Sequence, residues 1–147
     1  MKKIYTLVLI STVIFTSCRK LNPEYKIVGT WKLDDVVKRH LFNNQHVDSE
    51  YGAGLFRFYD NGSVTYTDTV TLSGNWRMRN EDRGYYDNDG NWQQKNNLIL
   101  YMHLVNFATN REIDWYFDEA IFKRSSDRLD GFMYYATSSY QYSFRRQ

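Results

Sequence analysis

An alternation of apolar and polar side chains with a period of two runs through residues 63–72. Successive side chains of a β-strand point to opposite faces, so this period predicts a strand with one buried and one wet face. The predicted inner face carries Val64, Tyr66, Asp68, Val70 and Leu72, and the outer face carries Ser63, Thr65, Thr67, Thr69 and Thr71. No long helical period follows residue 20, and an aromatic content of 18 % favours strands.

Similar strand-like stretches recur along the chain, separated by turn signals such as Asn61-Gly62 and Ser73-Gly74. We expect eight strands, at about residues 27–37, 55–59, 63–72, 74–79, 97–105, 112–118, 128–136 and 140–146. Eight is the number at which an up-and-down barrel encloses side chains or one small ligand. The sequence therefore predicts an all-β fold in one domain, an eight-stranded antiparallel up-and-down β-barrel over residues 27–147.

Three connections depart from simple turns. Residues 38–54 form a long polar segment, and such a loop in a compact domain is often a lid or a binding loop. Residues 80–96 are polar and rich in Gly, Asn and Asp, and they allow a small extra hairpin around Asn88-Asp89-Gly90. The pattern from Glu119 to Phe122 is ambiguous, because a bulge would place either Ile121 or Phe122 inward.

The first and last predicted strands carry complementary apolar faces. Trp31 shares one face of the first strand with Gly29, and the small glycine permits close approach by another group. Arg146 follows Phe144 on the apolar face of the last strand. If the last strand pairs antiparallel with the first, the Arg146 guanidinium lies beside the Trp31 indole and can stack on it. We therefore expect a structural cap formed by Gly29, Trp31 and Arg146.

A family resemblance rests on the order of four short motifs. They are Gly29-Thr30-Trp31, Phe56-x-Phe58-Tyr59-x-Asn61-Gly62, Gly74-x-Trp76 and Phe144-Arg145-Arg146. With them the chain resembles the lipocalin-like, calycin-type lipoproteins of Bacteroidetes-type bacteria over most of residues 26–147. The resemblance implies a barrel whose first-strand Trp is covered by an Arg from the last strand, and a possible internal cavity.

The amino-terminal segment has the pattern of a secretory leader. Residues 1–17 begin with two lysines, continue with a short apolar run and end in Thr16-Ser17. The only cysteine, Cys18, follows at once, so Phe15-Thr16-Ser17-Cys18 is similar to a bacterial lipobox. We expect a signal peptide at 1–17, lipid attachment at Cys18, a tether at 18–26 and localisation to the cell envelope, at the outer membrane of a Gram-negative bacterium. Ordinary cleavage that leaves a free thiol is the alternative.

Net charge limits the classes of binding partner, and the cysteine content limits the sources of stability. The chain has 19 Lys and Arg against 17 Asp and Glu, and removal of the leader lysines Lys2 and Lys3 makes it formally neutral. A neutral chain without a clustered basic face is not expected to bind nucleic acid. A single cysteine cannot form an internal disulfide, so the core must supply the stability.

The predicted barrel opens at the end formed by loop 38–54, the loop near residues 107–110 and the last turn. Apolar and aromatic walls with few polar groups describe a small-molecule pocket, but they describe a filled core equally well. Asp68 is the one charge on its apolar face, so we expect either a wet interior or a Tyr or Arg partner. The candidate ligand-binding residues are Leu33, Asp68, Val70, Trp76, Trp115, Tyr135, Tyr140 and Tyr142.

We expect no enzyme, cofactor or metal. The chain has no Gly-x-Ser-x-Gly, no cysteine nucleophile, no phosphate loop and no dinucleotide fingerprint. His40, His46 and His103 show no metal-ligand spacing, and a weak site of His40 and His46 with Asp48 and Glu50 is the lesser alternative.

Two functional hypotheses follow. The first is a lipid-anchored envelope protein that binds a small apolar or amphipathic ligand in the barrel. The alternative is a non-enzymatic interaction module with a filled core that holds another envelope protein, or a glycan, through surface aromatics. These aromatics are Tyr59, Tyr85, Tyr86 and Trp92.

Overall fold

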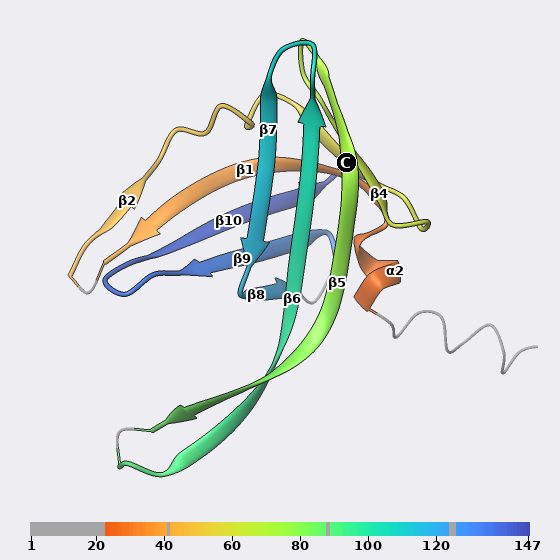
Figure 1. Cartoon of the computed structure of the whole chain (residues 1–147). Coiled ribbons are helices and arrows are strands. Elements are labelled where there is room, and N and C mark those ends of the chain that lie inside the picture. The colour runs from red at the N-terminus through yellow and green to blue at the C-terminus, as the bar shows by residue number, and fades with distance from the viewer. Residues whose placement is uncertain (1–22, 41, 88, 124–125) are drawn as a thin grey trace, which may run out of the picture.

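The computed structural model describes residues 23–40, 42–87, 89–123 and 126–147, which form one short helix and ten strands (Figure 1). The leader and Cys18 lie outside the described residues. The elements are α2 (Pro23–Ile27), β1 (Gly29–Arg39), β2 (Asn44–His46), β3 (Leu55–Phe58), β4 (Ser63–Thr67), β5 (Thr71–Tyr86), β6 (Trp92–Asn106), β7 (Arg111–Phe117), β8 (Glu119–Phe122), β9 (Arg128–Tyr134) and β10 (Ser139–Arg146).

All ten strands belong to one antiparallel sheet, in the order β7-β6-β5-β4-β3-β1-β10-β9-β8, with β2 paired to β1 outside this path. The ends of the order are β7 and β8, and no ladder joins these two strands in the described part of the chain. They are nevertheless consecutive, separated by Asp118 alone. The chain itself, not hydrogen bonding, thus connects the two ends of the curled sheet.

The predicted all-β antiparallel fold is confirmed at this level. The sheet has ten strands instead of eight, because the loop after β1 contributes β2, and the chain continues past Asp118 as a separate strand, β8. The sheet is not closed into a barrel by hydrogen bonds, since β7 pairs only with β6 and β8 only with β9 among the described strands.

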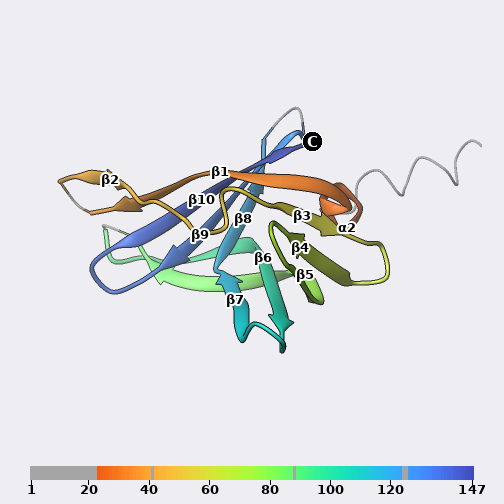
Figure 2. The ribbon, with the colours of Figure 1, turned by 90° about the horizontal axis from the view of Figure 1, so that it is seen from above.

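The first and last strands pair as expected. β1 and β10 run antiparallel from the Trp31–Arg146 pair to the Arg39–Ser139 pair, and the two strands lie side by side in both views (Figures 1 and 2). The first strand does not begin at Ile27 as predicted, because Ile27 is the last residue of helix α2. The rest of this helix, residues 23–26, lies in the segment predicted as a tether. Ile27 is fully buried, and its carbonyl accepts a hydrogen bond of 2.6 Å from the Trp31 indole.

A bulge interrupts β1 between Leu33 and Asp35. Leu33 pairs with Phe144 and Asp35 with Ser143, so Asp34 is the extra residue. Strict alternation would place Asp35 on the buried face of Trp31 and Leu33, where an unpaired carboxylate is costly. With the bulge, Val36 becomes the buried residue instead.

The predicted strand 63–72 is wrong in one respect, because it contains a turn. Thr67 pairs with Thr71, and residues 68–70 connect β4 to β5. The Asp68 carboxylate stabilises this turn by accepting the backbone N–H of Val70 at 2.9 Å. The predicted turn at Ser73-Gly74 is therefore inside β5, where Gly74 pairs with both Val64 and Leu104.

The core lies between two parts of the curled sheet, with β1, β9 and β10 on one side and β5, β6 and β7 on the other (Figures 1 and 2). Its largest fully buried side chains include Trp31, Phe56, Tyr66 and Phe117. Ring centroids of 4.7 Å for Phe56–Tyr66 and 6.1 Å for Phe117–Phe144 describe a packed aromatic interior. The interior of the sheet is thus filled by side chains.

The β5–β6 hairpin is the longest feature and extends beyond the rest of the sheet (Figure 1). The predicted extra hairpin within 80–96 is the far end of these two strands. There the Trp92 ring lies over Gly84, where an added Cβ would stand only 1.9 Å from the indole. Tyr85, Tyr86 and Trp92 are exposed on this end.

Candidate functional site

Three of the predicted ligand-binding residues meet in one pocket. Trp115 of β7 and Tyr140 and Tyr142 of β10 line a hollow of about 320 Å³. We call it the mouth pocket, since the long loop after β2 forms its other wall. Its remaining lining residues are Val36, Val47, Asp48, Ser49, Glu50 and Tyr51.

Trp115 joins the mouth pocket to the packed core. Its ring centroid lies 5.0 Å from that of Tyr142 and 5.4 Å from that of Tyr51, both of which line the pocket. Toward the interior, the same ring lies 5.7 Å from Phe56 and 5.9 Å from Phe117. The pocket is therefore a shallow aromatic cup above a filled interior.

The loop from Val47 to Tyr51 is held against the sheet by backbone bonds. The Val47 N–H donates to the Val36 carbonyl at 2.8 Å, and the Gly52 N–H donates to the Ser49 carbonyl at 3.1 Å. The Tyr51 N–H also donates to the Ser49 hydroxyl at 3.2 Å. These bonds fold the loop back so that the Tyr51 ring reaches Trp115.

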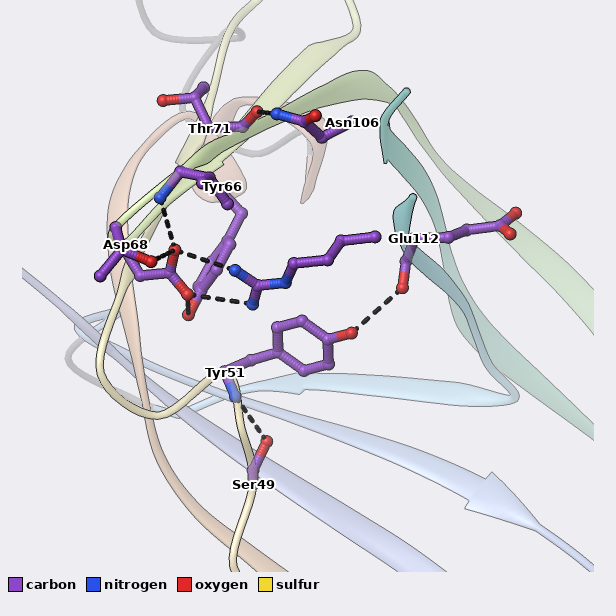
Figure 3. A network of polar contacts seen from close by, with 10 residues as sticks. Ser49, Tyr51, Tyr66, Asp68, Thr71, Asn106 and Glu112 are labelled. Carbon is purple, nitrogen blue, oxygen red and sulfur yellow. Dashed lines mark hydrogen bonds and ion pairs between the residues drawn. The ribbon is translucent and has the colours of Figure 1, made fainter. Parts of the chain in front are cut away.

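A polar network fixes the side of the cup beside Tyr51 (Figure 3). Arg111 donates to both carboxylate oxygens of Asp68, at 3.1 and 3.0 Å, and Tyr66 donates to the same carboxylate at 3.1 Å. The Tyr51 hydroxyl donates to the Glu112 carbonyl at 3.1 Å. The Arg111 guanidinium lies 5.8 Å from the centre of the Tyr51 ring. This network ties the β4–β5 turn and the loop after β2 to the start of β7.

The network sets the protonation of its members. The hydrogen bonds from Arg111 hold the pKa of the Asp68 carboxyl well below its usual value. Burial, aided by the neighbouring Glu50 carboxylate, raises the pKa of the Tyr51 phenol to about 12. Burial also raises the pKa of Tyr66, and the Asp68 carboxylate adds to this shift. Both phenols are therefore neutral hydrogen-bond donors near neutral pH.

The rim of the mouth pocket is polar. Asp48 and Glu50 are exposed at its edge, and the Lys38 ammonium lies 5.4 Å from the centre of the Tyr140 ring. An aromatic cup with a charged rim can hold a small molecule that has an apolar body and a polar end. In the described ranges, no group of three or more His, Cys, Asp or Glu side chains is placed to hold a metal ion.

Other predicted site residues lie elsewhere. Leu33 is buried and borders a separate hollow beneath the same loop. Val70 is half-buried and packs on the core. Trp76 packs edge-on against Phe58 at 5.9 Å and donates to the Tyr59 carbonyl at 3.0 Å, away from the mouth pocket. Tyr135 is 59 % exposed beyond the end of β9, where its ring lies 5.7 Å from that of the rim residue Tyr140 and its hydroxyl lies 3.9 Å from the Met133 sulfur.

The predicted cap residues come together at the opposite end. The Arg146 guanidinium lies 4.5 Å from the centre of the Trp31 ring and donates to the carbonyls of Lys26 and Val28, the latter at 3.0 Å. Gly29 has a φ of +134°, and a Cβ there would stand 2.7 Å from an Arg146 nitrogen. A side chain at position 29 would thus conflict with both the backbone and the guanidinium.

Sequence reasoning missed Tyr51, Val36 and Arg111. The length of loop 38–54 indicated a lid, but nothing in its pattern identified Tyr51 as the inserted residue. Strict alternation from Trp31 and Leu33 would place Val36 on the outer face, since the bulge at Asp34 is not visible in the sequence. The open alternative that Asp68 has a Tyr or Arg partner is the arrangement observed, with Tyr66 and Arg111.

No family model, curated protein or solved structure matches this chain. Within the described part of the chain, none of the helices has the length and apolar character required to cross a membrane.

Proposed function

We propose that this protein is a lipid-anchored, lipocalin-like component of the cell envelope that binds a small apolar or amphipathic molecule at the mouth pocket. The observation that carries the proposal is the convergence of Tyr51, Trp115, Tyr140 and Tyr142 around one hollow of about 320 Å³. Its volume is at the lower end of the range for small-molecule sites, which is roughly 300–1,000 Å³. The filled interior supports a ligand site at the mouth rather than inside the sheet.

The barrel-like closure belongs to the same proposal. The pairing of β1 with β10 and the direct succession of β7 and β8 support a sheet that wraps fully around its core. The leader pattern and Cys18 support membrane attachment through lipid, with the cup displayed in the envelope. The pocket has neither a nucleophile beside a base nor a metal cluster among its described residues, so we propose binding without catalysis.

Titration with phenylnaphthylamine, a neutral fluorescent probe, tests the pocket. Tyr140→Ser removes an aromatic wall of the pocket at a partly buried position, and it should weaken binding of the probe about tenfold, because an aromatic contact is worth about 1 kcal/mol. Tyr85→Ser is the matched control on the far hairpin and should bind as the wild type does. Equal affinity in all three proteins would refute the pocket. If Tyr140→Ser alone weakens binding, mass spectrometry of molecules that co-purify with the protein identifies the natural ligand class.

One observation favours a second candidate, an interaction module for an envelope protein or a glycan. Tyr85, Tyr86 and Trp92 are exposed on a hairpin that projects from a filled body, whereas Tyr59 is half-buried elsewhere beneath Arg57. A glycan array probed with the protein and with Trp92→Ala tests this candidate. Specific glycan signals that disappear in the variant would support it, and identical arrays would exclude a role for this aromatic tip in glycan binding.

A further inference from the structure

A second hollow, of about 410 Å³, lies on the outer face of the sheet, and the mouth pocket shares no lining residue with it. Strands β5, β6 and β7 form it, and Arg77, Arg79, Ile99, Tyr101 and Tyr116 provide its chemistry. We call these five residues the arginine–tyrosine groove. The predicted ligand-binding residue Trp76 also lines this hollow, but none of these five residues entered the predicted binding set.

The register of the three strands explains why these side chains are neighbours. Arg77 pairs with Tyr101 across β5 and β6, and Tyr101 pairs with Tyr116 across β6 and β7. Arg79 pairs with Ile99 in the next outward-facing position. Arg77 and Arg79 on β5 therefore lie on one side of Ile99, and Tyr101 and Tyr116 lie on its other flanks.

The floor of the groove is unusually apolar for an outer face. Ile99 is only 2 % exposed, although it belongs to the face opposite the core residues Leu100 and Met102. Tyr101 and Tyr116 are 39 % and 41 % exposed, so their rings remain accessible beside it. A flat apolar group can lie against these exposed rings above Ile99, which removes apolar surface from water on the ligand and on the tyrosines.

The charge of the groove is positive and partly uncompensated. Arg79 forms an ion pair of 3.1 Å with Glu81. The Arg77 guanidinium, by contrast, has no ion pair or hydrogen bond among the described residues, and it is exposed. Glu24 and Asp60 border a separate hollow on its other side. Asp114 lies beside the Tyr101 hydroxyl. Arg77 is thus the side chain in the groove that is free to receive an anion.

We propose that the arginine–tyrosine groove is a second binding site, for a small molecule that joins a carboxylate, sulfonate or phosphate to a flat apolar body. The planar Arg77 guanidinium matches such an anion with two parallel hydrogen bonds. Ile99 and the two tyrosine rings receive the apolar body. The mouth pocket is less suited to an anion, because the carboxylates of Asp48 and Glu50 stand at its rim together with the Lys38 ammonium.

Two probes with the same aromatic body separate the sites. Anilinonaphthalene sulfonate carries the anion, and phenylnaphthylamine is the same ring system without it. In the wild-type protein we expect the sulfonate to bind more tightly than the neutral probe at the groove, with an affinity that falls as salt rises. Arg77→Gln should lower the affinity for the sulfonate about tenfold, as expected for one charge-assisted pair, and should leave the affinity for the neutral probe unchanged.

Matched variants make the test decisive. Arg57→Gln removes one outer-face arginine from β3, with the same change in net charge, and should bind the sulfonate as the wild type does. Arg77→Lys keeps the charge but not the planar fork, and should be intermediate. The proposal is overturned if Arg77→Gln binds the sulfonate with wild-type affinity, if Arg57→Gln weakens it equally, or if only Tyr140→Ser abolishes it. In that last case the sulfonate occupies the mouth pocket, and the proposed function would survive without the second site.

Discussion

Arg146 connects the two ends of the described chain through a single side chain. It stacks on Trp31, donates to carbonyls that precede β1, and also donates to the Ser126 carbonyl at 3.3 Å. The Trp31 ring beneath it is fully buried and completes the core at this end. The stability of this end therefore depends on one planar, permanently charged group.

Replacement of Arg146 by Ala should lower the free energy of unfolding by about 3 kcal/mol. The change removes hydrogen bonds from a charged donor and the cation–π contact, and it exposes Trp31. Arg146→Lys should recover only part of this loss, since an ammonium cannot serve the same carbonyls while it covers the ring. Equilibrium denaturation followed by tryptophan fluorescence measures both. An unchanged midpoint for Arg146→Ala would show that the cap contributes no stability.

The Asp68–Arg111 pair should make stability depend on pH in the acid range. The pKa of Asp68 is lower in the folded state than in the unfolded chain, so the folded state is favoured once the carboxyl is ionised. This contribution is complete above about pH 5 and is lost as the pH falls through the unfolded and then the folded pKa. Asp68→Asn should therefore be less stable than the wild type at neutral pH, with a gap that narrows toward about pH 2.

Denaturant unfolding of the two proteins at a series of pH values measures this gap. Arg111→Gln, which removes the partner, should reduce the same pH dependence. If wild type and Asp68→Asn keep a constant difference across the acid range, the pair does not contribute in this way.

At the scale of elements, alternation identified the faces but not every boundary. A three-residue turn at 68–70 leaves Tyr66 and Leu72 on the same face, so the period of two continues through it and conceals it. The β-branched residues Thr67, Thr69 and Thr71 favour a strand and strengthen this misreading. The bulge in β1 interrupts the period instead of continuing it, because one extra residue moves every later side chain of the strand to the other face. This displacement explains why Val36 was missed while Tyr140 and Tyr142 were found.

The bulge provides a deletion test of β1. Removal of one of the adjacent residues Asp34 and Asp35 should restore regular pairing with β10 and keep Val36 inward. Its cost should be below about 1 kcal/mol, since only the surface contacts of these carboxylates with Arg145 and His46 are at stake.

Removal of Leu33 is the matched deletion, and it should cost roughly 3 kcal/mol or more, because Asp34 then takes the inward position of this buried side chain. Thermal unfolding of the two deletions measures the difference. Equal losses would show that residue 34 is not the extra residue of the strand.

At the scale of the molecule, the parts predicted well are those set by pairing and composition. The antiparallel all-β fold and the contact of the terminal strands follow from local patterns. The mouth pocket was predicted only through Trp115, Tyr140 and Tyr142. Its other wall comes from loop 47–51, whose position depends on contacts with Glu112 and Trp115 that are distant in sequence.

The proposed membrane attachment concerns the whole chain and has a direct test. The full-length protein, expressed in a Gram-negative host, should partition into the detergent-rich phase of a cell lysate. Cys18→Ser should move it to the aqueous phase, because a diacylated cysteine supplies the stable anchor. Intact-protein mass spectrometry should show the lipid mass on the wild type only. Aqueous partition of the wild type would reject the anchor.

The pairing of β1 with β10 also determines when this protein can finish folding. Strand β1 cannot complete its hydrogen bonds until the distant residues 139–146 have also been synthesised. A ladder between such distant segments forms slowly, because the intervening loop must first close. The polypeptide therefore stays open along this seam until that segment has been made, which is the condition that an export channel for unfolded chains would require.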